Sequence, residues 1–289
     1  MSRAEDLQAT LASRAGDIAA ELGDGALGVS VFDYLSGFEW SLNGDAWFHA
    51  ASTIKVAILA GLFDAIERGR FTLESRLHVR NRFLSVLDGQ PFRVDARRDA
   101  DDDVHASIGK TMRVGELARH MIVRSSNLAA NLLLDLVGLD EARAALAARD
   151  IGGVDVRRGV EDERAFDAGV NNRVTPNGVV SLLRGIRDGR GFSSESSKAM
   201  IDILTDQEFA GGIAPGLPEA IRAVARVAHK TGDISTVSHD AGIVFLPGRP
   251  PYVVVILVAR DGDASARTGA LAAISGVVYD AIAAAGEAA

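Results

Sequence analysis

The order of helical and β-type segments along the chain predicts an α+β fold. We expect an antiparallel five-stranded sheet flanked by the two terminal helices, with an all-helical lobe inserted in the middle of the sequence. Helical spacing of apolar residues occupies both ends of the chain, β-type runs lie just inside them, and the middle returns to helical spacing. At 289 residues the chain is long enough to bury a full core.

Each element follows from its own pattern of apolar residues. We predict, in order, a helix over 4–22, strands over 27–34 and 38–42 joined by a hairpin at 35–37, helices over 53–67, 114–122 and 127–136, strands over 223–228, 241–246 and 252–258, and a helix over 267–285. Residues 1–47 and 195–289 are expected to form the α/β sandwich lobe, and residues 48–194 the helical lobe. We expect the two lobes to form one interleaved structural unit, with a functional site between them.

Composition excludes several classes of protein. A net charge of −8 argues against a nucleic-acid partner. The absence of cysteine excludes disulfides and thiolate chemistry, and the six histidines show no metal-type pairing, so we predict neither metal nor cofactor. Charged residues interrupt every apolar stretch near the N-terminus, so no signal peptide or membrane span is expected. As written the protein is expected to be cytoplasmic and monomeric; a removed leader would make it periplasmic or secreted.

The segment Ser52-Thr53-Ile54-Lys55 begins a predicted helix and carries a possible nucleophile. Ser52 and Lys55 lie three residues apart, which places them on one helix face. Burial among the apolar residues that follow would lower the pKa of Lys55 and let it act as a base. The chain has only four lysines among 31 basic residues, which favours a chemical role for this one. A second match to the same spacing, Ser107-Ile108-Gly109-Lys110, is interpreted as chance.

Two further short motifs follow in the chain. Ser125-Ser126-Asn127 precedes a helical run, where its residues would also serve as a plain helix N-cap. Lys230-Thr231-Gly232 lies between β-type runs; it offers a charge and a hydroxyl for a carboxylate, or it forms a turn.

In this order and at these intervals, the three motifs resemble those of the class A β-lactamases and their penicillin-binding relatives. The resemblance covers most of the chain and implies the β-lactamase/transpeptidase-like fold. It implies Ser52 as the nucleophile, Lys55 or Glu161 as its base, and Ser125 as a proton relay to the leaving nitrogen.

The resemblance also implies how the substrate is bound. The Asn127 amide would hold a substrate carbonyl, and Lys230 with Thr231 would bind its carboxylate. Gly232 would let the substrate approach the strand, and the N–H of Asp233 would complete an oxyanion hole with that of Ser52.

The segment that would carry the water-activating carboxylate departs from the family pattern. Glu161 stands where the deacylation glutamate is expected, with Asp162 and Glu163 as rival bases. Asp162 replaces the usual proline, Ala165 replaces the asparagine that helps to hold the hydrolytic water, and Ser126 replaces an aspartate. Acylation is therefore better supported than fast deacylation.

The function predicted is a class A β-lactamase-like serine hydrolase that acts on a small-molecule β-lactam or a D-Ala-D-Ala-like peptide. The alternatives are a D-Ala-D-Ala peptidase, penicillin-binding protein or esterase with slow deacylation, and a non-catalytic ligand sensor. The charge-dense stretch within residues 81–110 is interpreted as a solvated loop, or as a rim of the active-site mouth. His239 falls near the position of a carboxylate-binding arginine in some relatives. Arg260 or Arg267 could supply that charge instead, although both are expected at the surface.

Overall fold

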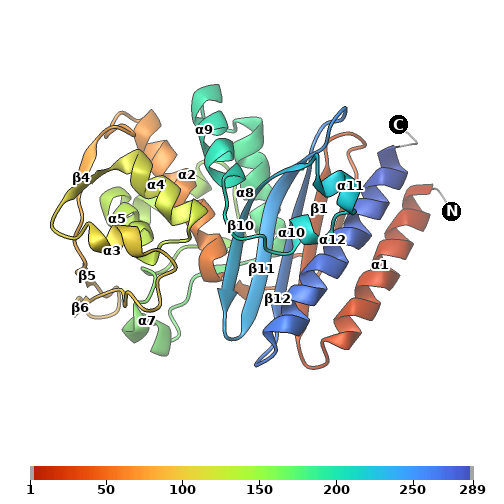
Figure 1. Cartoon of the computed structure of the whole chain (residues 1–289), viewed down its shortest axis with the longest axis horizontal. Helices are drawn as coiled ribbons and strands as arrows, with labels where there is room; N and C mark the ends of the chain where they lie inside the picture. The colour runs from red at the N-terminus through yellow and green to blue at the C-terminus, as the bar shows by residue number, and fades with distance from the viewer. Residues whose placement is uncertain (1–2, 287–289) are drawn as a thin grey trace. The chain divides into compact units, whose positions relative to one another are not determined.

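The computed structural model describes residues 3–286, and the chain divides into two compact units (Figure 1). Unit 1 contains residues 1–53, 174–184 and 210–289, and unit 2 contains residues 54–173 and 185–209. The first boundary falls at residue 54 where the sequence predicted 48, and the last at 210 where it predicted 195. The ends of the predicted sandwich lobe, residues 1–2 and 287–289, lie outside the described residues.

Unit 1 is built on one antiparallel sheet with the strand order β10-β11-β12-β1-β2, which confirms the predicted five-stranded sheet. Its elements are α1 (Arg3–Glu21), β1 (Ala26–Asp33), β2 (Glu39–Leu42), β3 (Phe48–His49), η1 (Ala51–Thr53), the first part of α8 (Pro176–Asp188), α10 (Ile213–Gly216), α11 (Glu219–Arg222), β10 (Arg226–Ile234), β11 (Val237–Phe245), β12 (Tyr252–Ala259) and α12 (Ala264–Gly286).

The central strands of this sheet are covered on both faces. In β12, Tyr252 to Val258 are all buried, which explains why this stretch reads as an unbroken apolar run. The terminal helices α1 and α12 lie side by side on one face of the sheet, as predicted (Figure 1). The edge strand β2 instead alternates exposed and half-buried residues.

The strand β10 differs from its prediction and is important for the site. It begins at Arg226, after Ala223 has capped α11, and continues to Ile234, whereas the sequence predicted a strand over 223–228. The third motif therefore lies inside a strand and is not a turn. Pairing with β11 over the whole length, including Gly232 opposite His239, holds this polar stretch in the sheet. Because β10 is an edge strand, one side of its backbone faces away from the ladder.

Unit 2 is mainly helical and also contains two short antiparallel ladders, β4-β7 and β5-β6. Its elements are α2 (Ile54–Glu67), β4 (Arg76–His78), β5 (Phe83–Leu84), β6 (Pro91–Phe92), α3 (Asp102–Ala106), β7 (Thr111–Arg113), α4 (Val114–Val123), α5 (Asn127–Val137), α6 (Leu139–Ala147), β8 (Val154–Asp155), α7 (Glu163–Asp167) and α9 (Ser194–Thr205); β9 (Arg173–Val174) lies at the boundary.

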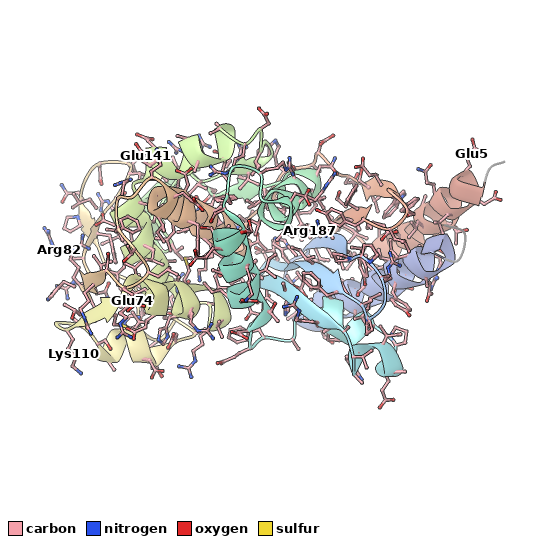
Figure 2. All side chains as sticks on the ribbon, turned by 90° about the horizontal axis from the view of Figure 1, so that it is seen from above. Glu5, Glu74, Arg82, Lys110, Glu141 and Arg187 are labelled. Carbon is pink, nitrogen blue, oxygen red and sulfur yellow. The ribbon has the colours of Figure 1, made fainter. Side chains whose placement is uncertain are left out.

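The helix α2 is the centre of unit 2. Every residue from Ile54 to Ala65 is buried, so the helix is covered on all sides, as its apolar sequence predicts. Charged side chains such as Arg82, Lys110 and Glu141 lie instead at the surface (Figure 2). Within residues 3–286, none of the helices has the length and apolar character needed to cross a membrane.

Candidate active site

In unit 1, the predicted nucleophile lies against the third motif. Ser52 is the middle residue of the short helix η1, which packs on β10. A Cβ added to Gly232 would lie 3.2 Å from the Ser52 amide nitrogen and equally close to the side chains of Ala51 and Thr53. The glycine at position 232 therefore allows β10 to pack closely on the segment that carries Ser52, where a Cβ would make tight contacts.

The neighbours of Gly232 in β10 include two ionisable side chains, Lys230 and Asp233. Lys230 is fully buried, and its Nζ donates to Thr231 O at 3.0 Å. The Asp233 side chain is exposed, and its carboxylate accepts a 2.8 Å hydrogen bond from Ser238 Oγ. Lys230 thus places a buried amine on the strand that packs on the Ser52 segment.

In unit 2, Lys55 is the second residue of α2 and is fully buried. Its Nζ donates to Ser125 O at 2.5 Å, to Ser125 Oγ at 3.2 Å and to Asn127 Oδ1 at 2.8 Å. Desolvation lowers its pKa from 10.5 to about 7, against the opposing charges of Asp99 and Glu161. Near neutral pH, Lys55 therefore exists in both charged and neutral forms, as a base requires.

The Asn127 amide connects the lysine to the candidate deacylation base. Its Oδ1 accepts from Lys55, while its Nδ2 donates to Glu161 Oε1 at 2.8 Å. Glu161 Oε2 accepts from the Asp95 amide at 3.0 Å. The structure thus brings together Lys55, Ser125, Asn127 and Glu161, which come from three separate stretches of the sequence.

The two rival bases, Asp162 and Glu163, bond to residues outside the predicted site. Asp162 is buried at the N-cap of α7, where it accepts from the amides of Val86 at 3.0 Å and Ala165 at 3.2 Å. Glu163 is exposed and pairs with Arg98. Of the three adjacent acids, Glu161 alone is bonded to a residue of the predicted site.

Backbone strain gathers at the same positions. Among residues 3–286, five non-glycine residues have positive φ, and three of them adjoin or belong to the predicted site: Ala51 at 44°, Ser125 at 57° and Glu161 at 62°. Such conformations cost on the order of 1–3 kcal/mol each and persist where surrounding contacts hold them. This clustering is a signal of function that the sequence does not contain.

His239 is a structural residue and not a contact for a substrate carboxylate. It is 1% exposed, its Nδ1 accepts from Val258 N at 3.2 Å, and its Nε2 donates to His49 O at 2.8 Å. Burial lowers the pKa of His239 to about 4, so the ring is neutral near pH 7.

The surface prediction for Arg267 is wrong. Arg267 is 2% exposed and donates to Ser238 Oγ at 3.0 Å and to the carbonyl oxygens of Ile234 and Ser235. These hydrogen bonds brace the β10–β11 turn.

Sequence reasoning missed a set of buried acids in the charge-dense stretch. Asp99 and Asp101 have fully buried carboxylates, so the interpretation of this stretch as a solvated loop is wrong for both. Asp99 binds the amides of Asn127 and Leu128 at 2.9 Å each. These helix-capping partners lie more than twenty residues away, so no local pattern would have identified them.

Asp101, Asp103 and His120 form the one group of possible metal ligands found among the described residues, with ligand atoms within 4.8 Å of one another. Asp101 already accepts from His120 at 2.5 Å, and Arg124 bonds to both aspartates. The group is therefore satisfied as an ion-pair network that ties α3 to α4.

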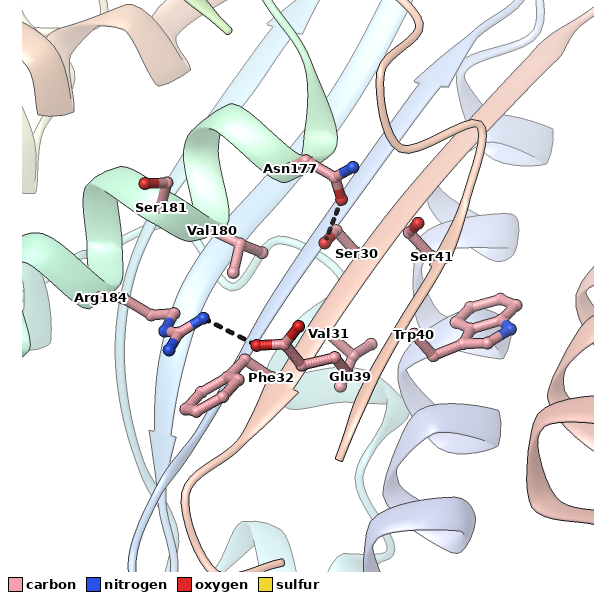
Figure 3. A pocket seen from close by; sticks show the side chains of 10 residues that line it. All are labelled: Ser30, Val31, Phe32, Glu39, Trp40, Ser41, Asn177, Val180, Ser181 and Arg184. Carbon is pink, nitrogen blue, oxygen red and sulfur yellow. Dashed lines mark hydrogen bonds and ion pairs between the residues drawn. The ribbon is translucent and has the colours of Figure 1, made fainter. Parts of the chain in front are cut away.

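A cavity of about 300 Å³ lies in unit 1 between β1, β2 and α8 (Figure 3). Its polar groups bond to one another: Ser30 Oγ donates to Asn177 at 2.8 Å, and Arg184 pairs with Glu39 at 3.0 Å. None of the predicted catalytic residues lines it.

The fold and these residue sets define a β-lactamase-like hydrolase. The pattern of the Beta-lactamase enzyme family matches residues 9–282, so the chain belongs to this family. It is 24% identical over 262 residues to the β-lactamase AER-1 of Aeromonas hydrophila, covering 89% of this chain and 81% of that one.

Solved structures agree with this assignment. A β-lactamase from Sphaerobacter thermophilus superposes with a TM-score of 0.80 at 25% identity, covering 95% of this chain and 97% of that one. A point mutant of PBP-A, solved as an acyl-enzyme complex with penicillin G, gives 0.78 at 26% identity, covering 94% of this chain and 96% of that one. The predicted β-lactamase/transpeptidase-like fold is confirmed.

Proposed function

We propose that the chain hydrolyses the amide bond of β-lactams through an acyl-enzyme formed on Ser52. The observation that carries the proposal is the environment of Lys55, which is buried, bonded to Ser125 and Asn127, and has a pKa of about 7. The proposal also requires that the residues of the two units act at one site, as the sequence predicts.

In the acylation step, neutral Lys55 takes the proton of Ser52 Oγ, which attacks the carbonyl carbon. The Oγ–C bond forms, and the amide C–N bond breaks once the carbonyl re-forms. Ser125 Oγ, 3.2 Å from Lys55 Nζ, relays the proton to the leaving nitrogen. The amides of Ser52 and Asp233 stabilise the oxyanion, and Lys230 and Thr231 bind the substrate carboxylate.

The side-chain amide of Asn127 can bind the substrate if it gives up one weak hydrogen bond. One of its Nδ2 hydrogens is bonded to Glu161 at 2.8 Å, and the other is directed to Arg98 O at 3.5 Å. Because the second contact is long, a substrate carbonyl can replace it at small cost.

In the deacylation step, Glu161 takes a proton from a water molecule that attacks the ester carbonyl, and Ser52 leaves with a proton. We expect this step to be slower than acylation, and two features support this expectation. Both oxygens of Glu161 already accept hydrogen bonds, and Ala165, four residues further on, is buried and has no polar side chain to orient water. These features favour the second candidate, a penicillin-binding protein or D-Ala-D-Ala peptidase with slow deacylation.

Intact-protein mass recorded over time after mixing with benzylpenicillin and a chromogenic cephalosporin tests the proposal. An adduct on Ser52 that appears and disappears while product accumulates is the expected result. A persistent adduct would favour the peptidase or penicillin-binding alternative, and no adduct with either compound would contradict the β-lactam assignment.

A further inference from the structure

Asp99 belongs to none of the three motifs, but it bonds to residues of the second motif and to Leu128. It lies between β6 and α3, and its carboxylate is fully buried. Its Oδ1 accepts a hydrogen bond from Asn127 N at 2.9 Å. Its Oδ2 accepts from Leu128 N at 2.9 Å and from Ser126 Oγ at 3.3 Å, and it lies 3.1 Å from His105 Nε2.

These contacts give α5 two caps. Ser126 is the local N-cap and accepts from Ala129 N at 3.1 Å. The amides of Asn127 and Leu128 remain in the first turn, and Asp99 binds both from 28 and 29 residues away. A carboxylate at a helix N-terminus is also favoured by the helix dipole, so this contact is strong as well as specific.

The capped turn carries the residues that bind Lys55. Ser125 holds a φ of 57°, and both its O and Oγ accept from Lys55. The Asn127 backbone is tied to Asp99 while its side chain connects Lys55 to Glu161. Asp99 therefore restrains the residues that directly follow the strained Ser125, and with them the turn that orients Ser125 and Asn127.

We infer that Asp99 is a positioning residue for acyl transfer, which holds Ser125 and Asn127 against Lys55 through the first turn of α5. The inference rests on the proposed function, since the reaction it serves is the acylation of Ser52. It assigns to the 81–110 segment a part in catalysis that the motifs do not include.

The charge of Asp99 gives a second measurement, the titration of Lys55. This titration would not change if Asp99 only stabilised the fold. Asp99 and Glu161 are the acids that raise the pKa of Lys55 against desolvation. His105 pairs with Asp99, and Arg98 lies near Glu161, so these are the further titratable and charged groups around the pair. Removing the charge of Asp99 should therefore move the titration of Lys55 to lower pH.

The test compares Asp99→Asn with Asp102→Asn, which removes the same charge from an exposed neighbour in the same segment. The backbone N–H groups of Asn127 and Leu128 each donate to a different oxygen of Asp99. Asparagine has only one such oxygen, so its side-chain NH₂ would face the second backbone N–H. We expect the rate of Ser52 acylation by benzylpenicillin to fall about 10- to 100-fold, the loss expected for a charge-assisted hydrogen bond. In Asp102→Asn the rate should equal that of the wild type.

The lysine titration is measured on the same proteins by NMR of ¹³C-labelled lysine, since the chain has only four lysines to resolve. The Lys55 midpoint should shift to lower pH in Asp99→Asn, together with the acid limb of the acylation profile, and stay unchanged in Asp102→Asn. The inference would be overturned if Asp99→Asn had the acylation rate and the Lys55 midpoint of the wild type. Equal shifts of the Lys55 midpoint in Asp99→Asn and Asp102→Asn would also overturn it.

Asp99→Glu distinguishes the effect of the carboxylate's position from the effect of its charge. It also provides a test if Asp99→Asn does not fold. It keeps the charge but lengthens the side chain by one methylene, so acylation should slow several-fold while the Lys55 midpoint stays near that of the wild type. An unchanged rate would count against positioning. If wild-type protein formed no adduct with benzylpenicillin, the proposed function would fail, while the lysine titration would still decide whether Asp99 acts on Lys55.

Discussion

The chain contains the spacing Ser-x-x-Lys twice, and the two copies lie in opposite environments. Lys55 is fully buried and donates to three oxygen atoms of the second motif. Lys110 is exposed at the surface, after a glycine with a φ of 87° (Figure 2). Ser107 ends α3, where its hydroxyl donates to Asp103 O at 3.0 Å.

The difference shows that spacing alone does not create a base. Burial removes the water that would otherwise stabilise the lysine charge, and this desolvation lowers the pKa of Lys55 to about 7. The second copy has a serine and a lysine at the same spacing, but its lysine is exposed and no buried helix surrounds it. The comparison can be tested by making matched changes in both copies.

The largest effect is expected from removing the two serines. Ser52→Ala should abolish the covalent adduct with benzylpenicillin and lower turnover at least ~1,000-fold, because no other group takes the place of the nucleophile. Ser107→Ala should leave both unchanged. Intact-protein mass after mixing decides the matter, and a retained adduct in Ser52→Ala would refute the assignment of the nucleophile.

Replacing the lysines is expected to have the next largest effect. Lys55→Met keeps the length of the side chain but removes the base, so the acylation rate should fall about 100- to 10,000-fold. Lys110→Met is the matched control and should acylate like the wild type. Equal rates in the two variants, measured by stopped-flow mixing with the chromogenic cephalosporin, would mean that burial of Lys55 has no chemical consequence.

Changing the acid that Asn127 connects to Lys55 tests the second half of the reaction. Glu161→Gln should leave the adduct forming but extend its lifetime about 100-fold or more, since no carboxylate would then accept the proton of water. Glu163→Gln, at an exposed acid two residues away, is the control. An adduct that decays as fast in Glu161→Gln as in the wild type would assign the water-activating role to another group.

The smallest effect concerns the pH dependence of stability. The folded pKa of Lys55, about 7, lies below the ordinary lysine value of 10.5, so the unfolded chain binds more protons between these limits. The Lys55 contribution therefore makes the free energy of unfolding rise with pH across this window, by at most ~1.4 kcal/mol per pH unit. Urea unfolding from pH 7 to 9 should show a smaller rise in Lys55→Met than in Lys110→Met. Identical slopes in the two variants would contradict a lowered pKa.

Several features of the fold could be predicted because they depend on local pattern. The apolar run after Lys55 predicted the buried helix α2, and the alternation or continuity of apolar residues predicted most strands of the sheet. The strand β10 was misplaced because its polar residues, from Lys230 to Asp233, break the apolar pattern. Their strand conformation depends on pairing with β11, which lies in a separate segment.

The candidate site shows the same division. The sequence by itself determined which residue types are available and in what order: a serine and a lysine three residues apart, a second serine with an asparagine, and a glutamate further on. Only the tertiary structure decided that Lys55 is desolvated, that His239 is a neutral structural residue and that Asp99 caps α5. The physical reason is that burial and hydrogen-bond partners are supplied by segments distant in sequence, and these set the charge and the orientation of each group.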